Sequence, residues 1–589
     1  MSKRKDFTIG SGGVYLPFAR VRQWFFVGVV LSTGGIGAVM MTDIIGDNGV
    51  SLLELIILAL FVTTFTWISV PFWNAVIGFF LILLQRDPLS LQSTVHLTKS
   101  GGAISNRTAL IMPIRNEDPN RVIRGIAAVL ESLRETRYAD KFDLYLLSDT
   151  NDESIIVQEE KAWAWLCRNV ESSHGLSYHR REVNIGRKAG NIADFCQRWG
   201  DEYEYMVILD ADSLMTGETL VRLVQSMERA PNAGLMQTVP VPTPGTTLFG
   251  RSIQFSACLY SRMLATGQSF WQTDAANYWG HNAILRITPF RQHCMLPKLS
   301  GKPPFGGEVL SHDFVEAALM RRAGWSVFLL PSLGGSYEGA PENVIDYAKR
   351  DRRWSQGSLQ HLRLLFAGGF HLVSRLHMFF GACGYLSSVV WFLLLLVSTA
   401  YVLFPVLSSS VLTTEPWNLT TNTVSLLLAT VCLLFSSKFL GLILALIYEK
   451  NNFGGLLNLL GSFCLEIVLA FVIAPVMMMY HTRFVVSILT GHDVSWGPQI
   501  RDRKTLPWHE IFRGIGWITL FGLLWAGITL YFSPLFFLWL SPVFLGLLFA
   551  VPLVSTTGNY FIGQWVGSQG FFQVHTDRGL LQEVSAGSR

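Results

Sequence analysis

Long apolar stretches flank a charged central segment, and this alternation constrains the fold of the chain most. Residues 24–41 and 52–84 are apolar, and each stretch is long enough to cross a hydrocarbon core about 30 Å thick. Similar stretches resume at residue 378 and continue to residue 554. Only 15% of the 589 residues are charged, against about 25% in a typical soluble domain. The sequence therefore predicts a membrane protein, and its formal net charge of +4 gives no reason to expect a nucleic-acid partner.

The distribution of basic residues predicts which side of the membrane each loop occupies. Arg20 and Arg22 precede the first apolar stretch, whereas the loop at 42–50 has acidic but no basic residues. Because basic residues favour the cytoplasmic side, we expect the N-terminus inside the cell. The basic segment 491–513 is also expected inside, which a single crossing by residues 456–489 would not allow. We therefore expect that stretch to cross twice or to lie partly at the membrane surface, with seven or eight membrane segments in all.

The central segment has the pattern of an α/β domain. Between residues 100 and 375, charged residues, proline and glycine separate short apolar runs, and runs suited to strands alternate with helical patterns. This alternation predicts a mixed, mostly parallel sheet that is covered on both faces. The expected strands are at 109–114, 143–147, 205–209, 235–239 and 326–330.

Two carboxylates follow the most apolar of these expected strands. Residues 206–209 lead directly into Asp210, Ala211, Asp212 and Ser213. In open α/β sheets ligands bind beyond the carboxyl ends of the strands, and Mg²⁺ or Mn²⁺ commonly binds carboxylates together with phosphate oxygens. Asp210 and Asp212 are therefore candidate ligands for a divalent cation that holds a diphosphate. The pattern also fits an acidic turn exposed to solvent, since Asp-x-Asp is short and common.

Polar residues also follow two other strands and occur in a glycine-containing loop. Asn116 and Glu117 follow the first expected strand, and Asp149 follows the second. Each can hydrogen-bond a nucleoside, although each also fits an ordinary strand-to-helix loop. Lys188 lies in the sequence GRKAGN, where small residues let the backbone approach a phosphate and basic groups neutralise it. A solvated basic loop is the alternative interpretation.

Two stretches near the end of the central segment indicate a base and a site for a sugar. Ser311 fits the N-cap of a helix, which places Asp313 in its first turn. Asp313 is a candidate general base, a role that contributes about 10²–10⁴-fold to proton-transfer steps, or it simply complements the helix dipole. Arg350, Arg353 and Trp354 form R-x-x-R-W just before the apolar stretches resume. Arginine can hold a pyrophosphate and tryptophan a sugar ring, or the stretch is a basic belt beside the membrane.

The order and spacing of these motifs resemble those of the processive family 2 glycosyltransferases, which have the GT-A fold. The motifs are P-x-R-N-E, S-D, K-A-G-N, D-A-D, G-H-N-A, H-D and R-x-x-R-W, flanked by membrane spans. The whole set, with residues 336–361, most resembles the branch that makes the β-1,2-linked backbone of osmoregulated periplasmic glucans from UDP-glucose. Two motifs depart from the family pattern. Arg350 stands where the family has Gln, and Ser311-His312-Asp313 replaces Thr-Glu-Asp, so that only Asp313 matches.

The resemblance implies a role for each matching residue. Asp313 would be the catalytic base, and Asp210 and Asp212 would hold Mg²⁺ or Mn²⁺ with the donor. The residues expected to bind the donor UDP-glucose are Asn116, Glu117, Asp149, Lys188, Asp210, Arg350 and Arg353. The residues expected to bind the growing glucan are Tyr278, Trp279, His281, Asn282 and Trp354. The residues expected in a gating loop, by comparison with related synthases, are Trp496, Gln499 and Arg501.

These expectations divide the chain into seven regions. The expected regions are 1–85 with two spans, 100–345 as the cytoplasmic GT-A catalytic domain, 346–377 as interface helices with R-x-x-R-W, 378–490 as transmembrane or interfacial helices, 491–513 as a cytoplasmic gating-type loop, 514–556 as a transmembrane hairpin, and 557–589 as a cytoplasmic tail. The sequence thus predicts a multi-pass enzyme of the bacterial inner membrane that transfers glucose with inversion. We expect the glucan to leave through the membrane helices. The resemblance also implies acyl carrier protein and a periplasmic glucan-modifying protein as partners.

Two other functions stay open at this point. A non-processive transferase that loads one sugar onto a polyprenyl phosphate would share the cation site, but it would not need R-x-x-R-W or a gating loop. A transporter or channel with a cytoplasmic regulatory domain is the second alternative, because charges inside a membrane usually mark substrate or ion paths. Glu466 is almost the only charge in the apolar stretches that fits such a path.

Overall fold

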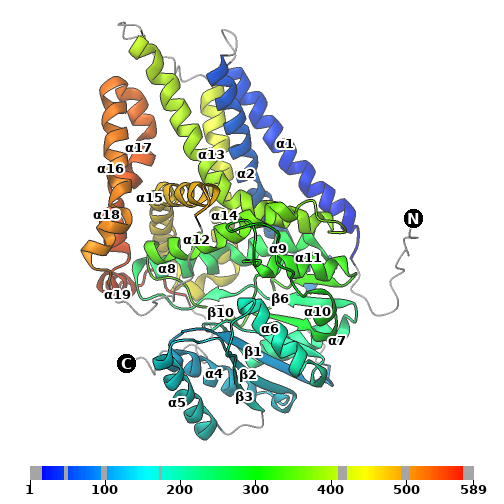
Figure 1. Cartoon of the computed structure of the whole chain (residues 1–589). Coiled ribbons are helices and arrows are strands. Elements are labelled where there is room, and N and C mark those ends of the chain that lie inside the picture. The colour runs from blue at the N-terminus through cyan, green and yellow to red at the C-terminus, as the bar shows by residue number, and fades with distance from the viewer. Residues whose placement is uncertain are drawn as a thin grey trace.

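Long apolar helices form one half of the molecule and an α/β domain forms the other (Figure 1). This computed structural model describes residues 16–45, 51–94, 102–170, 175–408, 421–492 and 505–574. The expected gating residues Trp496, Gln499 and Arg501 lie outside the described residues.

Six helices among the described residues are long and apolar enough to cross a membrane. They are α1 (Ala19–Ile45), α2 (Leu52–Leu83), α13 (Leu372–Ser408), α14 (Thr421–Leu444), α15 (Leu456–Leu489) and α16 (Trp508–Phe532). α17 (Pro534–Leu548) and α18 (Ala550–Thr557) meet at a bend of 52° and count as a seventh span when they are taken together. The chain is therefore a multi-pass membrane protein, and seven is the lower of the two expected numbers.

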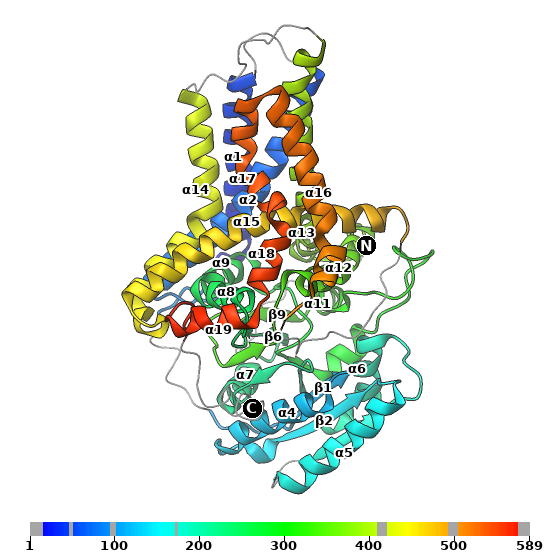
Figure 2. The ribbon, with the colours of Figure 1, turned by 90° about the vertical axis from the view of Figure 1, so that its left-hand side faces the viewer.

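α15 runs in a different direction from the other apolar helices. In Figures 1 and 2 it lies across the base of the helical bundle, between the upright helices and the α/β domain. It packs against α13 and α17, and also against α12 (Val344–His361), the helix that contains R-x-x-R-W. Its 34 residues form one unbroken helix, so residues 456–489 do not cross twice. The alternative expectation, a segment that lies partly at the membrane surface, stays a prediction.

The α/β domain is built on a seven-stranded mixed sheet of strand order β3-β2-β1-β4-β8-β6-β9. The strands are β1 (Thr108–Ile114), β2 (Phe142–Ser148), β3 (Leu176–Arg180), β4 (Tyr205–Ile208), β6 (Ala233–Gln237), β8 (Ala283–Arg286) and β9 (Ser326–Leu329). β8 is antiparallel to both of its neighbours, and the other pairs are parallel. All five expected strands occur. β3 and β8 were not expected, because one is a half-exposed edge strand and the other has only four residues.

Alternate residues of β1 enter two separate hydrophobic cores, one on each face of the sheet. Leu110 and Met112 pack in the core under α4 (Pro119–Arg134), α5 (Glu153–Asn169) and α7 (Gly217–Arg229). Ala109 and Ile111 pack in the core under α6 (Arg187–Arg198), α10 (Ile287–His293) and α11 (His312–Arg322). Helices on both faces therefore leave the carboxyl edge of the sheet as the place for a ligand.

A second, smaller sheet lies beside this edge and leads toward the membrane helices. Its strands are β5 (Leu214–Met215), β10 (Ser336–Glu338) and β7 (Val241–Pro242), in that order. After β7 the chain forms α8 (Leu248–Ser256), a π-helical turn (Ala257–Ser261) and α9 (Arg262–Gln272). The last described helix, α19 (Tyr560–Ser568), packs against α8.

The membrane helix α2 and the domain helix α9 cross in direct backbone contact. A Cβ atom on Gly78 of α2 would lie 1.9 Å from the carbonyl oxygen of Met263. A Cβ atom on Gly267 of α9 would lie 2.0 Å from the carbonyl oxygen of Asn74. Such a crossing has no room for any side chain, so glycine at these two positions holds the α/β domain against the membrane helices.

Candidate active site

The residues expected to bind a donor lie at one edge of the sheet. Asn116 follows β1, Asp149 follows β2, and Asp210 and Asp212 follow β4. β2, β1 and β4 are parallel neighbours in the sheet, so their carboxyl ends meet at the same edge. The fold therefore brings together side chains that are separated by almost a hundred residues in the sequence.

A tight turn presents the two carboxylates of Asp-Ala-Asp. The backbone N–H of Asp210 donates to Oγ of Ser213 at 2.9 Å, and the N–H of Ser213 donates to the carbonyl oxygen of Asp210 at 2.9 Å. Gly339 approaches the turn from the second sheet, since a Cβ atom there would lie 2.5 Å from Oδ2 of Asp212. The turn is thus fixed at its base and closely covered on one side.

Lys188 lies in the first turn of α6 and forms an ion pair with Asp210. Its Nζ also donates to the carbonyl oxygen of Gly280 at 2.8 Å. Only glycine fits at position 190 of the K-A-G-N motif, because a Cβ atom there would lie 1.9 Å from the carbonyl oxygen of Ile185. The predicted phosphate ligand and the predicted cation ligand are therefore direct neighbours.

Asp149 is held by an arginine that the sequence did not single out. Nε and Nη2 of Arg181 donate to the two carboxylate oxygens of Asp149, each at 2.7 Å. Both side chains are largely buried, so this forked pair fixes the orientation of Asp149. Arg181 follows β3, and the only sequence signal for it is the basic pair of Arg180 and Arg181.

Asn116 connects the loops that follow β1 and β2. Its backbone N–H donates to Oγ1 of Thr150 at 2.9 Å, and its side-chain amide donates to Oδ1 of Asn151 at 2.8 Å. Asn116 adopts a left-handed conformation with φ of 51°, which asparagine tolerates better than most residues. Glu117 follows it in the same loop. The loop is therefore preorganised beside Asp149.

In the G-H-N segment, His281 lies beside the Asp-Ala-Asp turn, whereas Asn282 lies in the protein core. Nε2 of His281 lies 3.1 Å from Oε2 of Glu338, and Nδ1 lies 3.4 Å from Oγ of Ser213. Burial opposes the charged imidazole, but Asp210 and Glu338 outweigh it and raise the pKa of His281 to about 9. His281 was expected to face the glucan, and it lies instead as a cation under the Asp-Ala-Asp turn. Glu338 was not among the predicted residues.

Two other residues expected to contact the glucan are in the protein core. Asn282 is fully buried, and its amide donates to Oγ of Ser336 at 2.9 Å and to the carbonyl oxygen of Tyr337 at 3.0 Å. Tyr278 is also fully buried. Both side chains therefore support the site from behind and do not reach its surface. Trp279 is only partly buried, and its backbone N–H donates to Oε1 of Gln237 at 2.8 Å.

Asp313 lies in the first turn of α11, as predicted. Ser311 occupies the N-cap position, although its side chain makes no capping hydrogen bond. A Cβ atom on Gly280 would lie 3.5 Å from Oδ2 of Asp313, so the carbonyl partner of Lys188 is also the neighbour of the candidate base. Burial raises the pKa of Asp313 above the ordinary value for a carboxyl group.

α12 is fastened to the loop that precedes Asp313. Nε2 of Gln360 donates to the carbonyl oxygen of Glu308 at 3.1 Å, and the backbone N–H of Leu310 donates to Oε1 of Gln360 at 3.0 Å. Nε2 of His361 lies 2.8 Å from the carbonyl oxygen of Ser311. The R-x-x-R-W helix and the candidate base are therefore parts of one hydrogen-bonded assembly.

The R-x-x-R-W motif presents a tryptophan whose side chain is 49% exposed. The guanidinium of Arg350 lies 4.5 Å from the ring centroid of Trp354, and 5.1 Å from that of Tyr347. These are cation–π contacts, so Arg350 is directed at the tryptophan. Arg353 precedes Trp354 on the same helix. One face of Trp354 is thus occupied by an arginine of its own motif.

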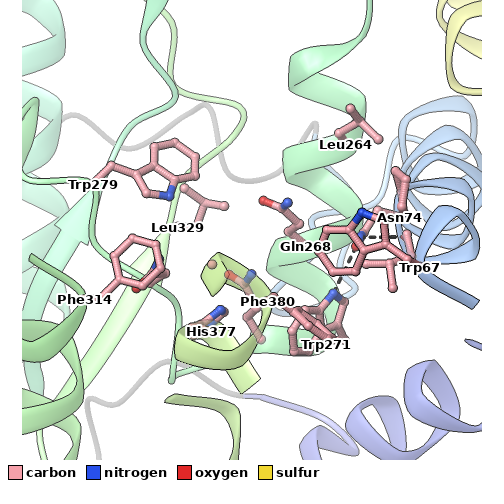
Figure 3. Close-up of a pocket in the computed structure, with 15 residues that line it drawn as sticks. Trp67, Asn74, Leu264, Gln268, Trp271, Trp279, Phe314, Leu329, His377 and Phe380 are labelled. Carbon is pink, nitrogen blue, oxygen red and sulfur yellow. Dashed lines mark hydrogen bonds between the residues drawn. The ribbon is translucent and has the colours of Figure 1, made fainter. Parts of the chain in front are cut away.

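A cavity of about 330 Å³ lies between α2, α9 and α13. Figure 3 shows Trp279 and Phe314 on one side of it and Trp67 and Asn74 on the other. Phe314 directly follows Asp313, so the cavity begins beside the candidate base. The candidate donor ligands and Trp354 are not among the described residues that line it. Aromatic faces together with amide groups are the kind of lining that suits a sugar.

The assembled site can hold an anionic ligand and remove a proton next to it. Lys188 and the His281 imidazolium supply positive charge beside the two carboxylates of the Asp-Ala-Asp turn. Asp313 supplies a further carboxylate beside Gly280, since a Cβ atom on Gly280 would lie 3.5 Å from Oδ2 of Asp313. This combination suits the transfer of a group from a phosphate leaving group to a hydroxyl acceptor.

Family comparisons define the class of the protein. A family model described as Glycosyl transferase family group 2 matches residues 205–562, which is more than half of the chain. A second model, described as Glycosyl transferase family 2, matches residues 109–294. The chain belongs to glycosyl transferase family group 2, and both matched regions contain the Asp-Ala-Asp turn.

The relatives within this family are similar over most of the chain. The chain is 40% identical over 570 residues to glucans biosynthesis glucosyltransferase H of Cupriavidus pinatubonensis, and 40% identical over 569 residues to that of Shewanella sp. strain ANA-3. It is 43% identical over 511 residues to that of Dickeya dadantii. The alignments cover 95%, 95% and 85% of this chain and 66%, 77% and 60% of the relatives. The chain therefore spans between three fifths and four fifths of the length of these relatives.

Solved structures give looser matches. The mannosyltransferase PcManGT from Pyrobaculum calidifontis, in complex with GDP-Man and Mn²⁺, has a TM-score of 0.39 and 16% identity, covering 65% of this chain and 99% of that chain. S. aureus TarS 1-349 has a TM-score of 0.28 and 12% identity, covering 66% of this chain and 94% of that chain.

Proposed function

We propose that this protein polymerises glucose from UDP-glucose into a β-linked glucan, with inversion at the sugar carbon. One observation carries the proposal: Lys188 and Asp210 meet Asp313 around the backbone of Gly280, beside a cavity that leads between membrane helices. The similarity to glucans biosynthesis glucosyltransferase H supports glucose as the sugar and a glucan as the product. The β-1,2 linkage follows from the sequence resemblance.

The proposed step is a direct displacement at the anomeric carbon. A hydroxyl oxygen of the glucan forms a bond to that carbon while the bond from the carbon to the β-phosphate oxygen of UDP breaks. The electron pair of the broken bond stays on the diphosphate, and the hydroxyl proton passes to the carboxylate of Asp313. Attack from the face opposite UDP converts an α-linked donor into a β-linked product.

The leaving diphosphate gains negative charge during this step, and the site has fixed positive charge to stabilise it. Lys188 is held in place by Asp210 and by Gly280, so it needs little rearrangement to approach a phosphate. Arg353 is proposed as a second phosphate ligand, from the motif on α12. Preorganised charge of this kind is usually the largest contribution to catalysis.

Asp210 and Asp212 fit a divalent cation that is shared with the diphosphate. No group of three or more His, Cys, Asp or Glu residues that could hold a metal occurs in the part of the chain that the structure describes. Two carboxylates one residue apart, with phosphate oxygens completing the shell, match what Mg²⁺ or Mn²⁺ requires. When bound there, the cation would supply further positive charge beside the diphosphate.

The donor and the glucan are proposed to approach from opposite sides of Gly280. Asp149, oriented by Arg181, and the Asn116–Glu117 loop would hold the uridine. Trp279 would hold the sugar chain because it lines the cavity that begins beside Asp313. Trp354 would do so because its half-exposed ring lies on α12, the helix that is hydrogen-bonded to the loop before Asp313. The cavity between α2, α9 and α13 is then the start of a path for the product through the protein's own helices.

The proposed setting is the bacterial inner membrane with the catalytic domain in the cytoplasm. If α15 lies along the membrane surface, then the end of α14 and the start of α16 lie on the same side of the membrane. The basic residues of the sequence between α15 and α16 make that side the cytoplasm by the positive-inside rule. We therefore propose the same seven regions that the sequence predicts, with α15 as an interfacial helix within region 378–490. The bilayer is a partner, and the resemblance adds acyl carrier protein and a periplasmic glucan-modifying protein.

The test uses the purified full chain in lipid nanodiscs with UDP-[¹⁴C]glucose and Mg²⁺. The expected product is a glucan whose linkage analysis gives β-1,2 bonds. A single glucose on added polyprenyl phosphate would instead support the non-processive alternative, and no transfer at all would overturn both. The D313N variant should bind UDP but transfer no glucose, whereas near-normal turnover would show that the base is another residue.

A further inference from the structure

A buried ion pair lies directly behind Asp313. Nδ1 of His312 lies 3.0 Å from Oε1 of Glu316, one helical turn further along α11. The two side chains are 12% and 2% exposed. His312 precedes Asp313 in the sequence, so the pair and the proposed base share the first turns of one helix.

The burial of Glu316 requires a nearby cation. A carboxylate that is almost fully removed from water is strongly unfavourable unless it is paired. His312 is the basic group within ion-pair distance of Glu316 among the described residues. Oε2 of Glu316 and Nδ1 of His312 are both buried and make no hydrogen bond among them, so the 3.0 Å contact is an ion pair and not a hydrogen bond. Both features favour the imidazolium form of His312.

The titratable groups around the pair include acidic, neutral and basic side chains. Burial, followed by the carboxylates of Glu316, Asp313 and Asp210, raises the pKa of the Tyr278 hydroxyl, which therefore stays protonated. Burial and then Glu316 likewise raise the pKa of Cys294. Two further cations act on this region: Lys188, which is already paired with Asp210, acts on His312 and Asp313, and Arg322 acts on Cys294.

We propose that His312, held by Glu316, is a positioning residue whose imidazolium keeps the carboxylate of Asp313 ionised and ready to accept a proton. The proposal rests on the proposed role of Asp313 as the base. Two effects support it: burial lowers the pKa of His312, but the carboxylates of Glu316 and Asp313 together outweigh burial and raise it overall. The His312 cation in turn opposes the effect of burial on Asp313. Glu316 alone has the opposite effect, since an unpaired anion would favour protonation of the base.

The experiment measures glucose transfer by the full-length protein in nanodiscs at saturating UDP-glucose, from pH 5 to pH 9. In H312Q the base loses a neighbouring cation and keeps a neighbouring anion, so the acidic limb of the rate profile should move up by about one pH unit. In the double variant H312Q/E316Q both charges are absent, and the limb should return toward that of the wild type. In E316Q the limb should stay in place or move to lower pH.

The matched control is R321Q, which breaks another ion pair of the same helix. Nη2 of Arg321 lies 2.7 Å from Oδ2 of Asp274, and the pair is of intermediate burial. Its acidic limb should coincide with that of the wild type. If H312Q and the double variant lower the rate equally at every pH, the pair is only structural and the inference is wrong. If H312Q does not fold, H312N takes its place, and an acidic limb in H312N that coincides with that of the wild type would overturn the inference. If D313N is inactive but the acidic limbs of the His312 variants coincide with that of the wild type, this inference is wrong and the proposed function stands.

Discussion

Nε2 of His481 lies 2.9 Å from Oδ2 of Asp351, and this contact joins α15 to the helix that contains R-x-x-R-W. The other ring nitrogen of His481 lies 3.1 Å from Oγ of Ser388 on α13. Three helices therefore meet at one imidazole, and the Asp351 and His481 side chains are largely buried. Trp354 follows Asp351 by less than one helical turn, so its position depends on a helix at the base of the membrane bundle.

Replacing His481 should loosen this junction. H481L would leave the buried Asp351 carboxylate without its partner, at a cost of about 1–3 kcal/mol or more for a charged group. We expect a lower Tm and a higher KM for the glucan acceptor, since Trp354 would lose its support. Thermal unfolding in detergent and initial rates with added acceptor measure both effects. S388A, which removes only the weaker contact, is the control, and an H481L protein with unchanged Tm would contradict the prediction.

Replacing Arg181 should weaken donor binding more than catalysis. R181A removes the forked contact that orients Asp149, and the loss of one such interaction corresponds to about a tenfold change in affinity. KM for UDP-glucose should rise by that factor while kcat changes little, because Asp149 is remote from the transferred proton. Isothermal titration with UDP and steady-state kinetics give the two quantities. R180A is the neighbouring control, and a fall in kcat alone would be inconsistent with the assigned role.

Replacing Lys188 should affect kcat. K188A removes fixed positive charge from beside the leaving diphosphate, and a single preorganised donor of this kind is worth about 10²–10³-fold in rate. UDP release at saturating donor measures kcat directly. R198A, at the exposed far end of α6, should retain normal turnover. A K188A protein with a kcat within twofold of the wild type would remove Lys188 from the mechanism.

Acid should destabilise the loop that carries Asp313. Burial lowers the pKa of His361 to about 4, although its hydrogen bond to the Ser311 carbonyl opposes the shift. Because the unfolded chain takes up this proton near pH 6.5 and the folded chain only near pH 4, stability should fall as the pH drops through that interval. The slope from this one group is at most about 1.4 kcal/mol per pH unit. Tm measured from pH 7 to pH 4 tests this, and H361Q should flatten the slope. An identical slope in H361Q would rule out this histidine as the cause.

Much of the fold was predictable because its signals are local. β1, β2 and β4 are apolar runs that end in polar residues, and the central position of Asp210 follows from that pattern alone. Asp313 was placed in the first turn of a helix from Ser311, and α11 begins there. β3 was missed because its residues are half exposed, as expected for an edge strand.

The contacts that complete the site were not predictable, because they depend on packing between distant segments. Arg181 and Glu338 pair with Asp149 and His281 across 32 and 57 residues, and the basic pair of Arg180 and Arg181 is the only local signal for either of them. Tyr278 and Asn282 have polar groups, so they resemble ligands in the sequence, yet their neighbours bury them. The direction of α15 was left open for the same reason, since hydropathy measures only how apolar a segment is.

The crossing of α2 and α9 should tolerate no side chain. G267A would bring a methyl carbon to 2.0 Å from the carbonyl oxygen of Asn74, and G78A would do the same against Met263. We expect either variant to lose monodisperse protein on size-exclusion chromatography and to show a lower Tm. G28A, on α1, has no atom within 4 Å of the new methyl group and is the matched control. Normal yield and Tm for G267A would show that the two helices can separate at no cost.

This crossing also limits how a polymer can be advanced. A catalytic domain attached only by flexible linkers could pivot on the membrane after each sugar is added and thereby push the product outward. Here the backbone of the membrane helix α2 touches that of the domain helix α9, so the domain and the membrane helices are expected to move as one rigid body. Under the proposed function, movement of the glucan by one sugar unit would then come from parts smaller than the domain, such as side chains or loops, while the domain and the membrane helices keep their relative positions.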